Sequence, residues 1–302
     1  MIVKDCHTHS GGFNYKEDKI YAFSSITGYQ YKMKALKELG IHIDSAVTFS
    51  QPSPYPFLTK KPWYNIVDYS KKNDEIGKKC LSLENMLFAC FVDPRLAKAP
   101  EEISRCVKKY DAQAIKIHLS AATVNVEILE YNGIVKTAEE YDLPLIVHMN
   151  PKDCEGIKQI AEKNMDVKFI IAHIAYLQTD FFNLVKKFDN VFFDTSAFVH
   201  ENFKYSMVAS IVTNKDFNSE FAECLNPKLG EKDKINLKEI KIDYNKMIEL
   251  VVEMAGSNNF LFGSDEGWSP LEEQIRIINE SNISSSDKEN IFYKNFNKIF
   301  NK

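Results

Sequence analysis

The sequence predicts an α/β fold, a (β/α)8 TIM barrel that spans residues 1–302 as a single domain. Eight short apolar runs rich in Ile, Val, Leu and Phe recur along the chain, and this composition is typical of strands buried on both faces. Segments with apolar residues at helical spacing separate these runs. Alternation of eight strands with helices over 302 residues is the pattern of a (β/α)8 barrel.

Each element can be assigned to a range of residues. The predicted strands are residues 1–7, 41–49, 86–92, 112–120, 143–149, 167–173, 190–196 and 259–265. The predicted helices are residues 31–40, 65–79, 100–110, 132–142, 154–164 and 180–189. A doubly wound open sheet is the alternative fold. Such a sheet usually carries a G-x-G-x-x-G turn after its first strand, whereas this chain continues with HSGGF.

Two insertions interrupt the regular alternation. Residues 50–64 follow the second predicted strand and are rich in proline, and residues 197–258 follow the seventh and are highly charged in their middle. Both insertions come after the C-terminal end of a strand, which is the catalytic side of such a barrel. The sequence leaves open whether they form a lid over the site or solvated loops.

Composition narrows the classes of function. The net charge is −4 with both signs interspersed, which argues against a nucleic-acid partner, because such proteins usually carry a basic stripe. No apolar run approaches the roughly 18 residues that span a membrane. Six scattered cysteines without a C-x-x-C pair favour a cytoplasmic protein whose thiols pack as small hydrophobes. We expect a small-molecule substrate. The oligomeric state is open, although homodimers are common among such barrels.

The first predicted strand ends in DCHTH, with His7 and His9 one residue apart. On an extended strand these two side chains point the same way. Two imidazoles on one face repel each other when protonated, so a shared metal ion is the usual explanation for such a pair. A polar strand end that meets only water is the alternative at this point.

Further polar residues close other predicted strands. They are Lys116 and His118 on the fourth strand, His148 on the fifth, His173 on the sixth and Asp265 on the eighth. In a barrel the C-terminal ends of all strands open onto one mouth, so these side chains should meet there with the first-strand histidines. Imidazoles with one carboxylate and an open position are typical of catalytic zinc.

These motifs identify a resemblance to the amidohydrolase superfamily, in particular its amidohydrolase-related branch, also called amidohydrolase family 2. The matching segments are DCHTH, AIKIHL, LPLIVHMN, VKFIIAH, NVFFDTSAF and NFLFGSDEGW. The resemblance implies a distorted (β/α)8 barrel with one divalent metal ion, most often Zn²⁺. It implies that His7, His9, His148 and Asp265 are metal ligands. It places His173, a further candidate ligand, beside the metal as the group that handles protons.

Two departures from the branch concern the mouth of the barrel. Glu266-Gly267-Trp268 follow the aspartate, where an aromatic residue and a proline are common. Ile174-Ala175-Tyr176 follow the sixth-strand histidine, where a glycine pair is common. Both changes affect the expected substrate more than the metal. We expect Tyr176 and Trp268, together with Phe13, to contact the substrate as apolar walls, and Lys116 and His118 to hold an anionic group.

Lys116 has two interpretations. The segment IKIHLSAATVN also resembles the fourth strand of dihydroorotases, in which a carbamylated lysine bridges two metal ions. In that case a second metal ion would recruit His148 and His173. In family 2 the lysine is more often a free cation that can meet a substrate carboxylate. The flanking strands match family 2 better, so we favour the free lysine.

The resemblance implies a metal-dependent hydrolase acting on a small amide, lactone or ester that carries a carboxylate. Asp265 is the expected acceptor of a proton from the attacking water, and His173 would orient the water or protonate the leaving group. Non-oxidative decarboxylation by the same apparatus is the alternative. A catalytically inactive metal-binding barrel is disfavoured because all expected ligand positions are filled. Imidazole and carboxylate ligands accept Mn²⁺ and Fe²⁺ as well as Zn²⁺.

Overall fold

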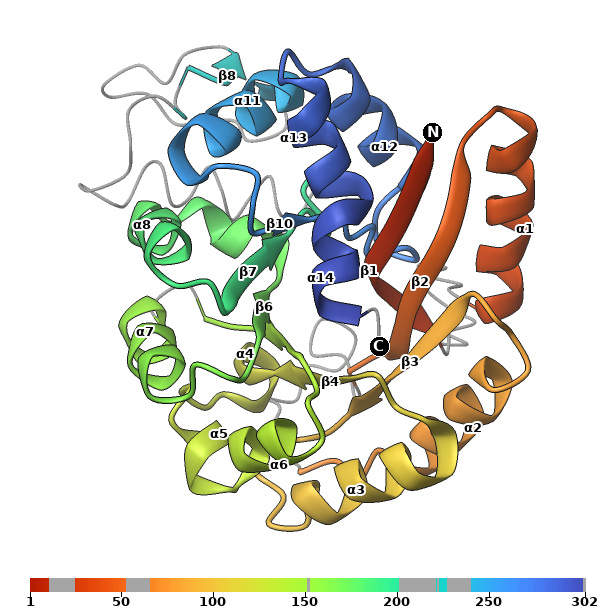
Figure 1. Ribbon diagram of the computed structural model, residues 1–302, viewed down its shortest axis with the longest axis vertical. Coiled ribbons are helices and arrows are strands. Elements are labelled where there is room, and N and C mark those ends of the chain that lie inside the picture. The colour runs from red at the N-terminus through yellow and green to blue at the C-terminus, as the bar shows by residue number, and fades with distance from the viewer. Residues whose placement is uncertain are drawn as a thin grey trace.

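The computed structural model describes residues 1–10, 25–52, 66–150, 153–200, 221, 223–226 and 240–300. Eight parallel strands form one sheet in chain order, which confirms the predicted barrel (Figure 1). The strands are β1 (Ile2–Ser10), β2 (His42–Ser50), β3 (Met86–Phe91), β4 (Ala114–His118), β5 (Leu145–His148), β6 (Phe169–Ile171), β7 (Val191–Asp194) and β10 (Phe260–Leu261). Each overlaps its predicted range, because an apolar run bounded by polar residues marks a strand buried on both faces.

The first and last strands are joined by backbone contacts. The Cys6 amide donates to the Phe262 carbonyl at 2.9 Å, and the Asp265 amide donates to the His7 carbonyl at 2.8 Å. Thr8 and Glu266 form a parallel bridge just beyond. These contacts close the barrel between β1 and the chain that follows β10, and they bring Asp265 next to the DCHTH motif.

Helices surround the strands (Figure 1). The six predicted helices correspond to α1 (Ile26–Glu38), α2 (Ser70–Cys80), α3 (Ala99–Tyr110), α6 (Ile134–Glu140), α7 (Cys154–Lys163) and α8 (Thr179–Lys187). Helix α1 begins five residues before its predicted range, because Ser25 caps it by accepting the Gly28 amide. Further short helices, α4 (Leu119–Ala122) and α5 (Ile128–Tyr131), connect β4 to α6.

The insertion at residues 197–258 is only partly described. It contains the antiparallel pair β8 (Leu225–Asn226) and β9 (Lys241–Ile242) and the helix α11 (Tyr244–Ala255), which packs between α8 and α12 (Leu271–Glu280). Helix α11 is therefore the regular helix between the last two barrel strands. Most of the insertion at residues 50–64 lies outside the described residues, and so does Phe13.

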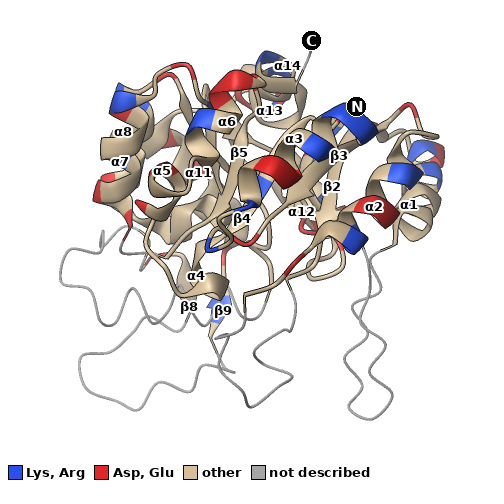
Figure 2. Ribbon diagram, turned by 90° about the horizontal axis from the view of Figure 1, so that it is seen from below, with Lys and Arg blue, Asp and Glu red and all other residues tan. Residues whose placement is uncertain are grey.

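One end of the barrel is sealed by the C-terminal segment. Helix α13 (Ser285–Glu289) leads through a π-helical turn at Asn290–Lys294 into α14 (Asn295–Phe300), which lies over the centre of the ring in Figure 1. Phe296 and Phe300 join the apolar cluster inside the barrel, to which every strand contributes. Figure 2 shows α4, β8 and β9 at the opposite end. The polar side chains at the C-terminal ends of the strands therefore lie away from the seal.

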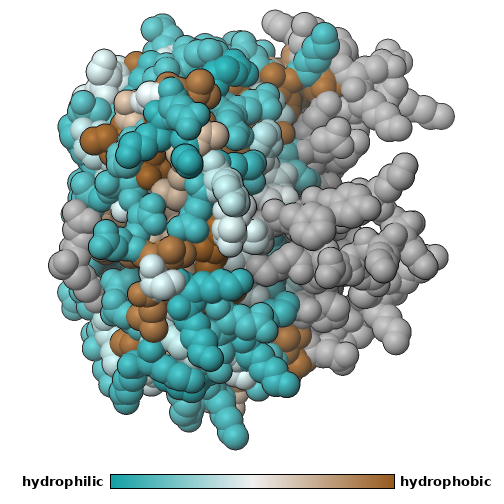
Figure 3. Space-filling model, turned by 90° about the vertical axis from the view of Figure 1, so that its right-hand side faces the viewer, coloured by the Kyte–Doolittle hydropathy of each residue, from teal (hydrophilic) through white to brown (hydrophobic). Residues whose placement is uncertain are grey.

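The described surface agrees with the composition. Basic and acidic residues are interspersed over the helices (Figure 2), and the face in Figure 3 is mostly hydrophilic with small apolar groups. All six cysteines are free, and all but Cys154 are buried, as predicted for thiols that act as small hydrophobes. Among the described helices, none is both long and apolar enough to cross a membrane.

Candidate metal centre

The two histidines of β1 lie inside the mouth of the barrel. His7 is fully buried and His9 nearly so, and their ring centroids are 5.4 Å apart. Both rings pack edge-on against Phe49, which is the β2 neighbour of His9 in the sheet register. The structure therefore confirms that the two side chains face the same space, and it adds Phe49 as the wall that holds them.

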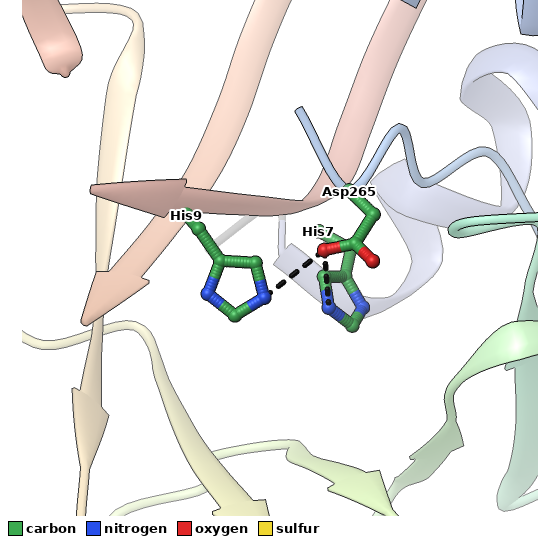
Figure 4. Close-up of side chains that lie close together, drawn as sticks. All are labelled: His7, His9 and Asp265. Carbon is green, nitrogen blue, oxygen red and sulfur yellow. Dashed lines mark ion pairs between the residues drawn. The ribbon is translucent and has the colours of Figure 1, made fainter. Parts of the chain in front are cut away.

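Asp265 completes this group (Figure 4). Its Oδ1 lies 3.0 Å from Nε2 of His9 and 3.7 Å from Nε2 of His7. Burial alone would raise the pKa of Asp265, but contact with His9 and the positive charge that His9 and His7 carry when protonated hold it well below its usual range, so the carboxylate is ionised. The 3.0 Å contact lacks hydrogen-bond geometry, and Oδ1 is buried without a hydrogen-bond partner among the described residues.

The other ring nitrogen of each histidine is anchored. Nδ1 of His7 lies 2.8 Å from Oδ2 of Asp194, and Nδ1 of His9 lies 3.2 Å from the Ser50 carbonyl. An ionised carboxylate and a carbonyl only accept hydrogen bonds, so each Nδ1 carries a proton. In the neutral form of each ring, which metal binding requires, Nε2 then presents a lone pair. Two lone pairs and an unpartnered carboxylate oxygen thus share one small space. This donor set fits a divalent cation, with anchored imidazoles as in other metal sites.

The charges around His7 are consistent with this assignment. Burial and the charge of Lys116 lower the pKa of His7 to about 4, so its ring is neutral near pH 7. Burial opposes ionisation of Asp194, but its contacts with His7 lower its pKa to about 2. The fully buried Lys116 places Nζ 3.4 Å from Nε2 of His7 and 4.8 Å from the centre of the Phe49 ring. Burial lowers the pKa of Lys116 to about 8.

His118 and His148 are neighbours at the ends of β4 and β5. They are paired in the sheet register, and their rings stack with centroids 3.7 Å apart. Nδ1 of His118 accepts the Ala121 amide at 3.1 Å and so caps α4, which leaves the proton of this ring on Nε2. Burial and neighbouring positive groups lower the pKa of both imidazoles well below their usual range, so both are neutral.

His173 lies between the two pairs of histidines. Its ring centroid is 5.5 Å from that of His7, and its Nε2 lies 2.8 Å from Nδ1 of His148. Its Nδ1 lies 3.0 Å from the Ser196 carbonyl, and its backbone amide donates to Oδ1 of Asp194. Burial lowers the pKa of His173, against the opposing effect of Asp265.

The structure thus brings the predicted polar residues to one mouth but does not arrange them as one ligand set. Among the described residues of the mouth, His7, His9 and Asp265 are the only group of three or more whose ligand atoms all lie within 4.8 Å of one another. His148 instead directs Nδ1 towards His173 and Nε2 towards the hydroxyl of Tyr176. Its assignment as a metal ligand therefore stays a prediction.

The segment after β6 has an unusual backbone. Every residue of the 3-10 turn His173–Leu177 has a positive φ, between 46° and 63°, and none is a glycine. A left-handed turn costs roughly 1–2 kcal/mol per residue for side chains with a Cβ. The turn is stabilised by packing, since Ile174, Ala175 and Leu177 are completely buried. It places the Tyr176 hydroxyl 2.6 Å from Nε2 of His148.

Trp268 lies further out. Its Nε1 donates to Oε1 of Gln51 at 2.8 Å, and its ring centroid is 6.3 Å from that of His200. These contacts connect the end of β10 to the end of β2. Its expected role as a substrate wall stays a prediction.

Sequence reasoning missed the bridging role of Asp194. The FFDTS motif indicates a hydrogen-bonded aspartate near His173, and the structure confirms that contact. The same carboxylate also holds His7 and accepts from the Ser196 hydroxyl. Asp194 therefore orients both His7 and His173. No local pattern in the sequence indicates this double contact, because the three residues lie on or just after different strands.

A second group of metal-capable side chains lies between β3 and α3. Ligand atoms of Cys90, Glu102 and Cys106 lie within 4.8 Å of one another. However, Oε1 of Glu102 accepts from Asn73 at 2.8 Å and from Arg105 at 2.9 Å. These hydrogen bonds give the group a structural role in joining α2 and α3 to the barrel.

Gly263 of the GSD motif follows β10 and lies against β1 and β7, where there is no space for a side chain. A Cβ added at Gly263 would lie 2.9 Å from Cβ of His7 and 3.3 Å from Cβ of Asp194. We expect Gly263→Ala to displace His7 and weaken Zn²⁺ affinity about 10- to 100-fold, the usual effect of disturbing the support of a ligand. A chelator competition assay measures this affinity.

Gly77→Ala is the matched control, because its Cβ would lie 2.6 Å from the Tyr110 ring, between α2 and α3. It should lower the free energy of unfolding without changing the Zn²⁺ affinity of the folded protein. Equal Zn²⁺ affinities for Gly263→Ala and wild type would contradict the expectation that a side chain at position 263 displaces His7 from the metal ion.

Comparison with known proteins agrees with the fold and the motifs. No curated protein matches the chain in sequence. Solved structures that share the fold include the probable 2-pyrone-4,6-dicarboxylic acid hydrolase of Acinetobacter baumannii, with TM-score 0.60, 13% identity and 99% coverage of both chains. Dihydroxybenzoic acid decarboxylase from Polaromonas sp. JS666, with bound manganese, has TM-score 0.58 and 14% identity, covering 99% of this chain and 96% of that one.

An amidohydrolase from Burkholderia multivorans with bound zinc has TM-score 0.60 and 8% identity over 99% of both chains. These likenesses support the barrel, and the family follows from a sequence match. The family model described as amidohydrolase matches residues 73–302, which include His148, His173 and Asp265. With eight parallel strands and this match over most of its length, the chain belongs to the amidohydrolase family.

Proposed function

We propose that the protein is a cytoplasmic, metal-dependent hydrolase that acts on a small amide, lactone or ester carrying a carboxylate. The observation that carries this proposal is the buried Oδ1 of Asp265, which faces Nε2 of His7 and His9 without a hydrogen-bond partner among the described residues. The free cysteines suit a reducing compartment. Metal dependence is general in the amidohydrolase family, and Zn²⁺ is the ion we propose.

His7, His9 and Asp265 would hold the ion, with His148 as the fourth ligand. When bound, a divalent ion supplies Lewis acidity and lowers the pKa of water towards neutrality. Asp265 is ionised, so its carboxylate can take a proton from the attacking water. His173 keeps its own proton on Nδ1 against Ser196, so Nε2 can receive a proton and pass it to the leaving group.

Lys116 and His118 would bind the substrate carboxylate. Lys116 is a buried cation, and His118 carries its proton on Nε2 because Nδ1 caps α4. A hollow beside His118 is lined by Tyr69, Phe91, Arg95 and the first residues of the β4–α5 connection. Arg95 in this lining is paired with Asp93 at 2.7 Å, so the hollow supplies apolar walls rather than positive charge. Tyr176 and Trp268 would contact the rest of the substrate.

Lys116→Met should raise KM for carboxylated substrates about 10- to 100-fold, because a hydrogen bond to a charged group contributes about 1.5–3 kcal/mol. The KM of uncharged analogues should change little. Steady-state kinetics on matched pairs of charged and neutral esters measures the difference. Lys168→Met, at a surface ion pair with Asp142, is the control and should leave both KM values unchanged. Equal KM changes for charged and neutral substrates would remove Lys116 from carboxylate binding.

The decisive experiment loads purified protein with Zn²⁺, Mn²⁺ or Fe²⁺ and tests it on carboxylated lactones, amides and esters. Metal-dependent hydrolysis that a chelator abolishes supports the proposal. Release of carbon dioxide from aromatic carboxylates without any hydrolysis would replace it by the decarboxylase alternative. Elemental analysis on the same samples should give one metal per chain, and two per chain would favour a carbamylated Lys116.

A further inference from the structure

The hydroxyl of Tyr176 reaches a histidine that is expected to bind metal. It lies 2.6 Å from Nε2 of His148, and the two rings meet edge-on with centroids 5.9 Å apart. The left-handed turn His173–Leu177 holds the tyrosine in this place.

The hydrogen bonds around His148 allow one assignment of protons. The Ser196 carbonyl accepts from Nδ1 of His173, so Nε2 of His173 presents a lone pair. Nδ1 of His148, 2.8 Å away, must therefore donate to that lone pair. A neutral imidazole has one proton, so Nε2 of His148 accepts from the Tyr176 hydroxyl. The structure thus describes His148 with its proton on Nδ1.

Metal binding requires the other tautomer of His148. Nδ1 points into the mouth towards His173, and a nitrogen that carries a proton cannot be a ligand. The proton must move to Nε2, which then has to donate instead of accept. A tyrosine hydroxyl is both a donor and an acceptor, so it can satisfy Nε2 in either tautomer by rotation of its O–H bond alone.

We propose that Tyr176 is a positioning residue that fixes the orientation of His148 and supports the tautomer in which Nδ1 binds the metal ion. This inference rests on the metal-dependent function proposed above. Ligating histidines generally donate their second nitrogen to a nearby acceptor, and loss of that acceptor typically weakens metal binding 10- to 100-fold. The strained backbone of residues 173–177 is consistent with a functional demand on the place of Tyr176.

Tyr176→Phe tests the proposal without changing the shape of the ring. We expect the Zn²⁺ dissociation constant, measured by competition with a chromogenic chelator, to rise about 10- to 100-fold. Tyr131→Phe, at a tyrosine that is 87% exposed, is the matched control and should bind Zn²⁺ like the wild type. Thermal unfolding of the metal-free variants checks that both remain folded.

Two further measurements separate positioning from a general loss of structure. In a double-mutant cycle, Tyr176→Phe should have no effect on Zn²⁺ affinity when His148 is already alanine, because the hydroxyl acts through that ring. Nitrogen NMR of labelled histidine should show the proton of His148 on Nδ1 in metal-free wild type and on Nε2 after addition of Zn²⁺.

The outcomes distinguish this inference from the proposed function. Wild-type protein that binds no Zn²⁺ would overturn both the metal site and the role of Tyr176. Strong binding by the wild type and by Tyr176→Phe alike would overturn the role of Tyr176 and leave the site at His7, His9 and Asp265 intact. An unchanged effect of Tyr176→Phe in the His148→Ala background would show that the hydroxyl does not act through His148.

Discussion

Asp265→Asn is expected to reduce kcat by about 10²–10⁴, the usual contribution of a general base, and to remove most of the bound metal. An asparagine cannot take a proton from water. The asparagine amide can donate hydrogen bonds to Nε2 of His7 and His9. The variant therefore loses the negative charge that attracts a cation and occupies the nitrogen atoms that would bind it. Turnover and metal content after dialysis against a defined Zn²⁺ buffer measure the two losses separately.

The neighbouring residue offers a matched control. Glu266 is buried and forms an ion pair with Lys32 at 2.6 Å, away from the imidazoles. Glu266→Gln removes the same charge one residue along the chain and should retain the metal and most of the turnover. If Asp265→Asn kept both wild-type metal content and wild-type turnover, the site would have to be sought elsewhere in the barrel.

The second large effect concerns acid stability of the metal-free protein. Burial and the charge of Lys116 lower the pKa of His7 from 6.5 to about 4 in the folded state. Between these values the unfolded chain binds a proton that the folded chain does not, so falling pH favours unfolding. The contribution of His7 is a loss of ~3 kcal/mol that begins near pH 6.5 and is complete near pH 4.

Asp5 changes the free energy of unfolding with pH in the opposite direction, so its contribution must be separated from that of His7. Burial raises its pKa from 3.8 to about 7, so its contribution to stability is present below pH 3.8 and is lost as pH rises to about 7. The measurement is therefore the difference between wild type and His7→Gln, by urea unfolding in chelator from pH 7 to pH 4. Wild type should lose stability relative to the variant as pH falls.

His42→Gln is the control for this experiment, because it replaces a histidine that is half exposed at the start of β2. Its free energy of unfolding at pH 7 should stay close to that of the wild type, which shows the effect of losing a histidine side chain from the surface. If the difference in free energy of unfolding between wild type and His7→Gln stayed constant from pH 7 to pH 4, the pKa of His7 would be the same in the folded and the unfolded chain. The expected effect of burial would then be wrong.

The positions of the strands and the general place of the site follow from the sequence. Each apolar run with a polar residue at its end became a barrel strand, and the GSD aspartate lies beside the first-strand histidines as the motif predicts. These features depend on local patterns or on the common direction of parallel strands.

Other features depend on contacts that no local pattern encodes. The hydrogen bond between Asp194 and His7 crosses from β7 to β1, and the contact of His148 with the Tyr176 hydroxyl is made from a left-handed turn. Glycine would be the usual indicator of positive φ, yet residues 173–177 reach it without glycine. The hydrogen bonds, and with them the protonated nitrogen of each ring, therefore required the structure.

The junction between β1 and the chain after β10 has a consequence for biosynthesis. More than 250 residues separate both imidazoles from the carboxylate that faces them, so the carboxylate is synthesised much later than the histidines. A nascent chain therefore holds two exposed histidines without their anionic counterpart during most of translation. The complete proposed ligand set exists only after the ring has closed, so we expect the metal ion to bind after the barrel has folded.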